Sequence, residues 1–316
     1  MATNELRPIN LEEYIGQEQL KEQITVSIGG SKKRQRTFPH TLLSGGAGLG
    51  KTSLSSVICN EMGSNITFAN AANIQKPADL LTYVVNLEDG DFLFIDEIHR
   101  LKKEFEEMLY TVMEDFRIDI PVKKGTDVEP VSITLPKFTL IGATTLKGGL
   151  TQPLLDRFGL KFELKEYTID ELSKIIKNVS IKLNANFDKE SLDLISECSR
   201  GTPRKAIHTL DRIIDFAVCD NVELITKDYT SKILKKLKID THGLEETDIH
   251  ILKLLYEEFN GSPVGINNLA AASGQQKDTL EYTIEPFLVK NKFVIRTPRG
   301  RRITKRGINI LKDYNL

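Results

Sequence analysis

The stretch that decides the fold reads TLLSGGAGLGKT and spans residues 41–52. An apolar, β-prone tetrapeptide precedes a glycine-rich loop, and the helix-prone segment 53–61 follows it. Strand, glycine-rich loop and helix, in this order, are the context in which the pattern G-x-x-x-x-G-K-[ST] forms a P-loop. Its backbone N–H groups and the positive end of the helix dipole bind phosphates. Lys51 is expected to reach the β- and γ-phosphates and Thr52 to ligate Mg²⁺, so the sequence predicts a nucleoside triphosphate site.

An acidic motif lies about 45 residues after Lys51. The apolar run 92–95, which we interpret as a buried strand, ends in Asp96 and Glu97. A P-loop enzyme needs a carboxylate at such a strand end to hold Mg²⁺, and Asp96 fits that role. Glu97 is then placed to act as the general base toward the attacking water. His99 has two open interpretations, a structural hydrogen bond or tuning of Glu97.

Other polar positions are ambiguous from the residues alone. The apolar run 138–143 resembles another sheet strand and is followed by Thr144 and Thr145. Ligands bind at the carboxyl ends of strands in open α/β sheets, so a hydroxyl here either senses the γ-phosphate or simply ends a strand. From the residues alone, Arg157 and Arg204 can each be read as an ordinary solvated or salt-bridged side chain.

The length and composition indicate a globular protein of several domains. A chain of 316 residues is long for one core and predicts two or three domains. No run approaches the ~20 apolar residues of a membrane span and the N-terminus is polar, so we expect a cytoplasmic protein. The three cysteines are scattered and match no metal or redox spacing. The net charge of −1 argues against nucleic-acid binding through global charge.

The patterning along the chain predicts an α/β fold in three parts. Residues 1–166 alternate apolar runs with amphipathic helices, as expected for a parallel sheet covered on both faces. Residues 167–240 are helical throughout and too short for a second α/β domain, so we expect a small helical lid. Residues 241–316 contain three helical stretches followed by two short β-prone pieces, a pattern typical of a winged helix-turn-helix.

The C-terminal part carries a strong local charge. Eight basic residues and no acid lie between Lys290 and Arg306. A solvated charged face would normally intersperse acids, so this pattern favours contact with DNA phosphates. Such contacts carry no base specificity.

Residues 119–135 resemble a hairpin inserted into the sheet domain. Ile120 and Val122 lie on its first strand and an apolar second strand returns from Val131. Apolar side chains at such a tip are typical of a surface that binds a protein partner. The alternative is a hairpin that packs on its own domain.

The order of these motifs resembles the AAA+ ATPases and, more narrowly, the RuvB family of Holliday-junction branch-migration motors. The resemblance spans about residues 6–306. Its most specific part is the arginine-rich motif RTPRGR at 296–301 with the winged domain, because unrelated proteins share the P-loop. The other stretches that carry it are RP at 7–8, YIGQ at 14–17, FIDEIHRL at 94–101, EDF at 114–116, GATT at 142–145, DRFG at 156–159 and RGTPR at 200–204.

The resemblance implies ATP and Mg²⁺ as cofactors and gives roles to individual residues. Arg157 matches the arginine finger, Arg204 the sensor-2 arginine, and Thr144 or Thr145 sensor 1, of which Thr145 is our choice. Lys51, Thr52, Asp96 and Glu97 keep the roles given above, with Thr52 and Asp96 at the metal. The positions that line the nucleotide match Leu6, Arg7, Gly48, Gly50, Ser53, Glu114, Asp115, Phe116 and Tyr167, together with Lys51, Thr52, Arg157 and Arg204.

The resemblance also implies partners. A finger that acts in trans requires each active site to lie between two subunits, which implies a ring, a hexamer in this family. Arg296, Arg299 and Arg301 are expected to contact duplex arms of a four-way junction. The hairpin with Ile120 and Val122 is expected to dock a RuvA-type junction-binding protein, and a RuvC-type resolvase is a further expected partner. The chain departs from the family in having GA at 46–47 where Pro-Pro is usual, and Leu155 in place of an arginine.

Three functions compete on this basis. The leading one is a ring motor that hydrolyses ATP and moves duplex DNA to drive branch migration in recombination and repair. The second is an ATP-dependent DNA-binding switch of the origin-initiator type, which has the same domains, and fold alone does not decide between them. The third is a protein remodeller or clamp-loader subunit, which needs no basic wing. The hairpin and the arginine-rich wing favour the motor.

Overall fold

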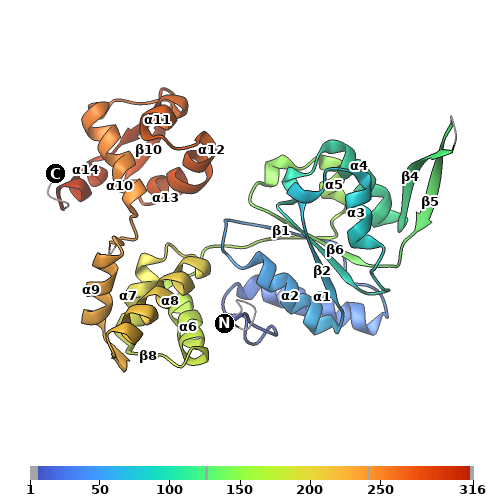
Figure 1. The fold of residues 1–316 in the computed structure, drawn as a ribbon, viewed down its shortest axis with the longest axis horizontal. Coiled ribbons are helices and arrows are strands. Elements are labelled where there is room, and N and C mark those ends of the chain that lie inside the picture. Colours follow the sequence, from blue (N-terminus) through green and yellow to red (C-terminus); the bar gives the residue numbers. More distant parts are fainter. Residues whose placement is uncertain (1–5, 125–126, 241, 314–316) are drawn as a thin grey trace. The chain divides into compact units, whose positions relative to one another are not determined.

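The computed structural model describes residues 6–124, 127–240 and 242–313, with only the backbone described at 77, 119–130, 147 and 313. The chain forms two compact units, and Figure 1 shows their elements. The N-terminal unit runs to Leu183 and includes Gly201–Ile207. The C-terminal unit comprises Asn184–Arg200 and the chain from His208.

The N-terminal unit is built on one parallel sheet of five strands in the order β2-β3-β6-β1-β7. All four strand pairs are parallel, as the continuous apolar runs predict for strands buried on both faces. The strands are β1 (Thr41–Ser44), β2 (Ile66–Asn70), β3 (Phe92–Asp96), β6 (Thr139–Thr144) and β7 (Leu160–Glu163). The strands predicted at 41–44, 92–95 and 138–143 are confirmed to within a residue, as β1, β3 and β6.

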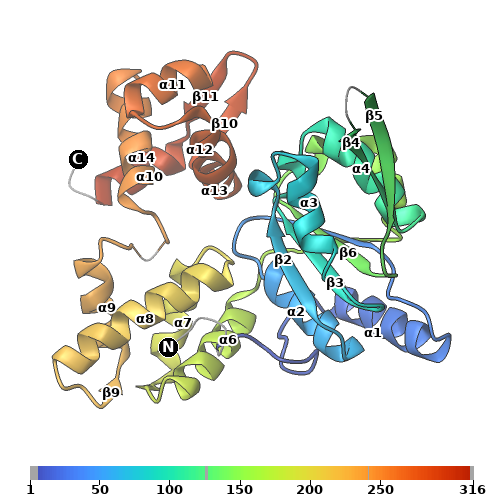
Figure 2. The same ribbon diagram turned by 45° about the vertical axis from the view of Figure 1, so that its right-hand side comes forward.

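Helices cover both faces of this sheet, α1 and α2 on one side and α3, α4 and α5 on the other (Figures 1 and 2). Alternation along the strands divides the apolar side chains between the faces. The helices are α1 (Glu18–Lys33), α2 (Lys51–Met62), α3 (Pro77–Val84), α4 (Lys103–Glu114), α5 (Gln152–Arg157) and α6 (Ile169–Lys182), with short 3₁₀ turns at Ala71–Asn73, Ile98–Arg100 and Lys147–Gly149.

The core beneath α3, α4 and α5 gathers apolar side chains from all of these elements. Leu93 and Leu140 of the sheet meet Leu80 of α3, Leu109 of α4 and Leu154 of α5. Each fully buried side chain of this size contributes roughly 1.5–3 kcal/mol. This packing fixes the carboxyl ends of the strands, where the predicted site lies.

His40, just before β1, is locked into this core by two backbone hydrogen bonds. Its Nδ1 accepts from the Leu140 N–H at 2.8 Å, so its Nε2 carries the hydrogen and donates to the Met113 carbonyl at 3.0 Å. Burial lowers the pKa of His40, opposed by the bond to Met113. The neutral ring is therefore the form that the fold requires.

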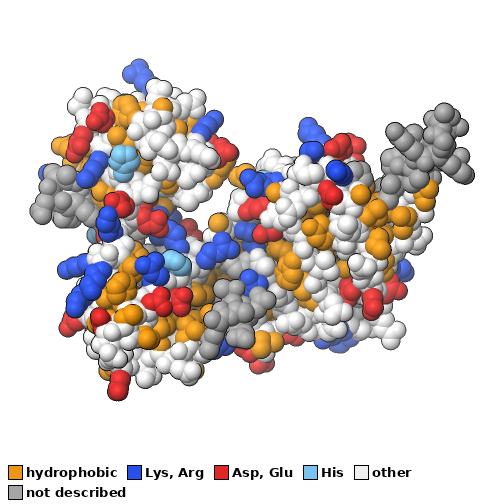
Figure 3. Space-filling view, in the orientation of Figure 1, with side chains coloured by type: hydrophobic (Ala, Val, Ile, Leu, Met, Phe, Trp, Pro, Cys, Tyr) orange, Lys and Arg blue, Asp and Glu red, His pale blue; other side chains and the backbone are white. Residues whose placement is uncertain are grey.

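A hairpin, β4 (Arg117–Lys124) and β5 (Asp127–Thr134), follows α4 and projects from this unit (Figure 1). Its pairing is antiparallel, with Ile118 opposite Ile133 and Ile120 opposite Val131. Ile118 and Ile133 belong to the core, whereas Val131 is 46% exposed. The side chains of Ile120 and Val122 lie outside the described ones. Figure 3 shows hydrophobic side chains at the surface along the stem of this hairpin.

The C-terminal unit is mainly helical. It contains α7 (Lys189–Cys198), most of α8 (Pro203–Cys219), α9 (Lys227–Lys236), and a two-strand pair β8 (Asn186–Phe187) and β9 (Leu224–Ile225). Then come α10 (Glu246–Lys253), α11 (Ile266–Ser273), α12 (Lys277–Thr279), α13 (Glu285–Lys290), β10 (Val294–Thr297), β11 (Gly300–Ile303) and α14 (Lys305–Asp313), with π-helical turns at Leu254–Glu258 and Leu280–Ile284.

The predicted winged helix is present in this unit. The β10–β11 hairpin is antiparallel, and its β11 strand also pairs with Val264 through Arg301. Helix α14 was not predicted, because its residues follow directly on the basic run. In the part of the chain that the structure describes, no helix is long and apolar enough to cross a membrane.

Candidate active site

The P-loop connects β1 to α2 and turns on three glycines with positive φ, Gly45 (145°), Gly48 (78°) and Gly50 (97°). A side chain at Gly45 would place its Cβ 2.7 Å from the Leu164 carbonyl oxygen, so both conformation and space require glycine there. Lys51 begins α2, and its Nζ donates to the carbonyls of Gly45 (2.8 Å) and Gly46 (3.0 Å). The ammonium thus lies inside the loop that is expected to hold phosphate.

Arg204 reaches the same loop from the start of α8. A Cβ at Gly48 would lie 2.9 Å from the Arg204 Cβ, and the Arg204 N–H donates to the Gly48 carbonyl at 3.4 Å. Burial lowers the pKa of Lys51; the carboxylates of Glu97 and Asp96 oppose that shift, and Arg204 adds to it. Two cations therefore share one small region, which favours an anionic ligand.

Tyr167 closes the other side of the P-loop. Its hydroxyl oxygen lies 3.0 Å from the Tyr14 hydroxyl and 3.2 Å from the Leu49 carbonyl, which can only accept, and its backbone N–H donates to the Gly201 carbonyl. Burial raises the pKa of both tyrosines. Tyr14 belongs to the YIGQ motif at 14–17, but it was not selected as a site residue from the sequence.

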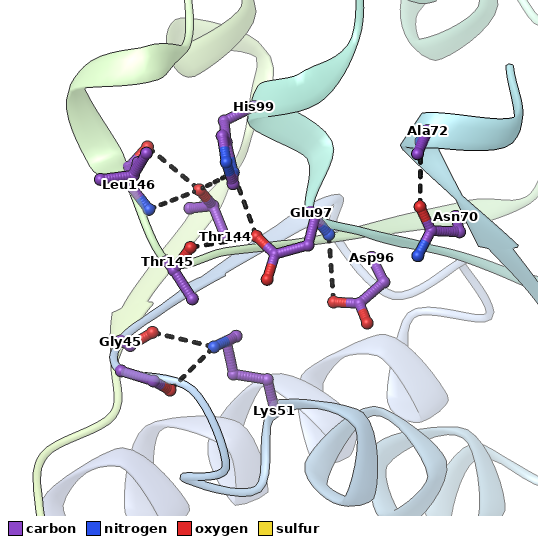
Figure 4. A network of polar contacts seen from close by, with 11 residues as sticks. Gly45, Lys51, Asn70, Ala72, Asp96, Glu97, His99, Thr144, Thr145 and Leu146 are labelled. Atoms are coloured by element: carbon purple, nitrogen blue, oxygen red, sulfur yellow. Dashed lines mark hydrogen bonds and ion pairs between the residues drawn. The ribbon is translucent and has the colours of Figure 1, made fainter. Parts of the chain in front are cut away.

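The two predicted acids end strand β3 beside this loop. Asp96 Oδ1 accepts from the Glu97 N–H at 3.0 Å, and Glu97 adopts a left-handed backbone with φ 49°. This conformation is uncommon for a non-glycine residue and is typical of functional sites. Figure 4 shows Lys51, Asp96 and Glu97 gathered between the ends of β3 and the P-loop. The structure brings the predicted phosphate ligand and both acids together.

The threonines after β6 join this cluster in different ways. Thr145 Oγ1 donates to Glu97 Oε2 at 3.0 Å, whereas Thr144 Oγ1 lies 3.0 Å from His99 Nδ1 and hydrogen-bonds both the N–H and the carbonyl of Leu146 (Figure 4). Thr145 therefore contacts the general-base candidate directly. His99 Nδ1 also lies 3.2 Å from Glu97 Oε2, so both interpretations of His99, a structural hydrogen bond and tuning of Glu97, stay open.

The donors fit a magnesium ion held jointly with phosphates. Among the described residues no group of three His, Cys, Asp or Glu side chains could hold a metal by itself. Thr52 lies in the first turn of α2, directly after the P-loop, and Asp96 is the last residue of β3. Mg²⁺ typically uses one or two protein oxygens plus substrate phosphates and waters, which is the donor set available here.

Arg157, the last residue of α5, belongs to a second cluster, which it forms with side chains of helix α4. Its guanidinium lies 4.4 Å from the centre of the Tyr110 ring, its Nε is 3.2 Å from Glu114 Oε1, and it donates to the Pro153 carbonyl at 2.9 Å. Glu114 ends α4 and is followed by Asp115 and Phe116. The structure therefore places Arg157 with the family's 114–116 motif.

A buried polar network holds the helix that carries Arg157. Glu106 of α4 accepts from the N–H and the hydroxyl of Thr151, which caps α5, at 3.1 and 2.5 Å. The Tyr110 hydroxyl lies 2.8 Å from Thr151 Oγ1. Sequence reasoning missed Glu106 and Tyr110. Their spacing of four, shared with Glu114, places all three on one face of α4.

The remaining nucleotide candidates have different surroundings. Leu6 and Arg7 lie in the segment before α1, where the Lys182 Nζ donates to the Arg7 carbonyl at 3.4 Å. Ser53 follows Thr52 on the first turn of α2 and is partly buried. The nucleotide-binding roles of these residues stay predictions.

In the C-terminal unit, the wing arginines are not equivalent. Glu285 of α13 accepts from Arg296 Nε (2.7 Å) and from Arg301 Nε and Nη2 (2.9 and 3.1 Å). The side chain of Arg296 is 56% exposed and that of Arg301 only 16%, while Glu285 is 6% exposed. Arg299 is exposed in the turn between β10 and β11. Arg301 is thus mainly an anchor of the wing.

Comparison with known proteins covers nearly the whole chain. Residues 6–164 match the model of the Holliday junction DNA helicase RuvB P-loop domain, 167–240 the RuvB AAA lid domain, and 241–312 the RuvB C-terminal winged helix domain. The RuvB branch migration complex subunit of Nitratiruptor is 47% identical over 97% of this chain and 91% of its own length. The RuvB branch migration complex subunit of Leuconostoc mesenteroides is 46% identical over 96% of this chain and 86% of its own length. A Thermotoga maritima RuvB structure, described as a Holliday junction branch migration motor, superimposes with a TM-score of 0.87 at 40% identity, covering 97% of this chain and 98% of that one.

Proposed function

Because this chain belongs to the RuvB family, we propose that it is an ATP-driven motor that moves duplex DNA to drive branch migration of Holliday junctions. The observation that carries the proposal is the division of its catalytic side chains into two clusters. Lys51, Glu97 and Arg204 surround the P-loop, whereas Arg157 is bound to α4. Two half-sites of this kind are complete only when a second copy supplies the finger.

In the proposed reaction, Glu97 accepts a proton from the attacking water as the water oxygen bonds to the γ-phosphorus and the bond to the β-phosphate oxygen breaks. Thr145, which donates to Glu97, holds the carboxylate and senses the γ-phosphate. Lys51, Arg204 and Arg157 of a neighbouring copy stabilise the charge on the phosphate oxygens. Thr52 and Asp96 would hold Mg²⁺, which would neutralise negative charge on the bound phosphates.

The shared site is tested by mixing two inactive variants. Lys51→Ala and Arg157→Ala are each expected to lose ATP hydrolysis, the latter by ~10³-fold or more. In a 1:1 mixture, about a quarter of the interfaces pair an intact Lys51 with an intact Arg157, so hydrolysis should return to about a quarter of wild type. A mixture that stays inactive, although it assembles, contradicts a finger in trans.

The proposed DNA contact rests on the C-terminal unit. Arg296 and Arg299 are exposed on the wing, and phosphate contacts from such arginines do not depend on sequence. Arg301 is expected to contribute mainly by holding the hairpin on Glu285. A ring, a hexamer as in the family, would enclose the duplex.

We further propose that the β4–β5 hairpin docks a RuvA-type junction-binding protein, and that a RuvC-type resolvase joins the complex. The support is an apolar stem that continues beyond the core, from buried Ile118 to exposed Val131, opposite Ile120 in register. Val131→Asp and Ile120→Asp should abolish partner binding and leave basal ATP hydrolysis unchanged. Normal co-elution of either variant with the partner would contradict the assignment.

The activity itself is tested with a synthetic four-way junction. Conversion to duplex arms should require ATP, Mg²⁺ and the RuvA-type partner, and should be lost in Lys51→Ala and Arg157→Ala. Tight duplex binding and measurable hydrolysis without conversion would instead support the ATP-dependent DNA-binding switch.

A further inference from the structure

His99 is a polar side chain of the Glu97 cluster to which the proposed mechanism gives no task. It lies in the 3₁₀ turn Ile98–Arg100, and its side chain is only 13% exposed. Its Nδ1 is 3.2 Å from Glu97 Oε2 and 3.0 Å from Thr144 Oγ1 (Figure 4). A ring nitrogen between two oxygens must either donate to them or accept from one of them.

The hydrogen-bonding partners decide between these possibilities. The Thr144 hydroxyl donates its single hydrogen to the Leu146 carbonyl (3.0 Å) and accepts from the Leu146 N–H (2.9 Å), so it has an acceptor site left for His99. A carboxylate only accepts. The network therefore assigns the hydrogen of His99 to Nδ1, shared between Thr144 and Glu97. Burial lowers the pKa of His99, with the Glu97 charge opposing it, so the ring that donates is neutral near pH 7.

The ring position is also fixed from the loop after β6. A Cβ at Gly149 would lie 2.9 Å from the His99 Cβ, and the Gly149 N–H donates to the Leu146 carbonyl at 3.2 Å. The loop thus packs closely against His99 at Gly149. The same loop leads through Thr151 into α5.

We propose that His99 is a positioning residue for ATP hydrolysis, whose Nδ1–H, together with the Thr145 hydroxyl, fixes the orientation of the Glu97 carboxylate after β3. This inference rests on the proposed role of Glu97 as general base. Thr145 and His99 both bond Oε2, and no described residue donates to the other oxygen, Oε1, which is therefore available to water. Loss of the His99 bond leaves the carboxylate with one restraint and lets it rotate.

The matched pair His99→Asn and His99→Leu separates this donor from the packing of the side chain. The amide nitrogen of asparagine can occupy the place of Nδ1, whereas leucine has similar bulk and no donor. We expect His99→Leu to lower kcat by about 10- to 100-fold with KM for ATP within about twofold, since a ~1 Å misplacement of a catalytic group can cost about 10²-fold. His99→Asn should retain kcat within about threefold of wild type.

Gly149→Ala provides a second route that leaves His99 itself unchanged. Its new Cβ displaces the turn that carries His99, so kcat should fall. In the His99→Leu background, the same substitution should lower kcat by less than a further factor of about two, because both changes act through the same hydrogen bond. Thermal unfolding and ring assembly are measured for every variant. Equal kcat for His99→Leu and wild type, or equal loss in His99→Asn and His99→Leu, would overturn the proposal. Glu97→Gln is the separate check: retained hydrolysis there refutes the general base itself.

Discussion

Substituting Glu285 should loosen the wing by a predictable amount, because this carboxylate holds two arginines. In Glu285→Ala, Arg296 returns to water at little cost, since more than half of its side chain is already exposed. Arg301 stays largely desolvated and keeps its charge. Removing one partner of a buried ion pair costs about 3–5 kcal/mol, and the residual exposure of Arg301 reduces this to about 2–4 kcal/mol.

Hydrogen exchange on the full-length chain measures this loss where it occurs. The Arg301 N–H donates to the Val264 carbonyl at 2.7 Å, and the Val264 N–H donates to the Arg301 carbonyl at 2.8 Å. A local loss of about 2–4 kcal/mol corresponds to a fall of about 30- to 1,000-fold in the protection of these two amides. Amides of the β1–β6 pairing in the N-terminal unit should be unaffected.

Two further variants make the reasoning refutable. Glu281→Ala is the control, because Glu281 lies one turn before Glu285 and acts on the pKa of Arg296 only through its charge. This variant should leave the exchange protection of the Val264 and Arg301 amides nearly unchanged. The double substitution Glu285→Leu with Arg301→Met replaces the pair by apolar groups and should recover most of the lost protection. If Glu285→Ala behaves like Glu281→Ala, the carboxylate does not anchor the wing, and the stability argument is wrong.

Three more outcomes are expected. The pKa of His40 is lowered in the folded protein, so the unfolded chain takes up the proton before the folded chain does as the pH falls below about 6.5. The free energy of unfolding should therefore decrease as the pH falls from about 6.5 to the lowered pKa. A His40 variant should lose this pH dependence in thermal melts from pH 7 to 5. Arg296→Ala should lower the log–log salt slope of duplex binding by about one, whereas Arg301→Ala should weaken binding with a smaller change of slope. Tyr110→Leu should lower kcat about tenfold without changing ATP affinity, because it frees the Arg157 guanidinium from its ring, and an unchanged kcat would count against that role.

What the sequence predicts well is what local spacing determines. The P-loop is one continuous stretch, and the positive φ of Gly45, Gly48 and Gly50 is the conformation for which those glycines are needed. The position of Asp96 and Glu97 at the end of β3 could be predicted because both follow directly on the apolar run 92–95. The resemblance correctly predicted the family and fold class, because its motifs extend from the P-loop to the wing.

The contacts that the sequence did not reveal join residues from different elements. Glu285 and Arg301 are 16 positions apart, and nothing in a helical acid indicates that a wing arginine will fold over it. Glu106 looks like an ordinary exposed helix acid, yet it is buried on Thr151. A charge run predicts a basic surface, but which of its arginines are free depends on a carboxylate outside the run.

Helix α4 explains why the two clusters of the N-terminal unit cannot move independently. The chain passes from Glu97 through one short turn into α4, and three side chains spaced by four along this helix hold the start and the end of α5. A helix of twelve residues packed on the sheet is rigid, so a shift of the turn after Glu97 must move the helix, shear its packing or break these polar contacts. Breaking the buried Glu106 bonds would leave a carboxylate without its donors, which costs about 1–3 kcal/mol or more. The orientation of Arg157 is therefore tied by packing to the strand end that carries the catalytic acids.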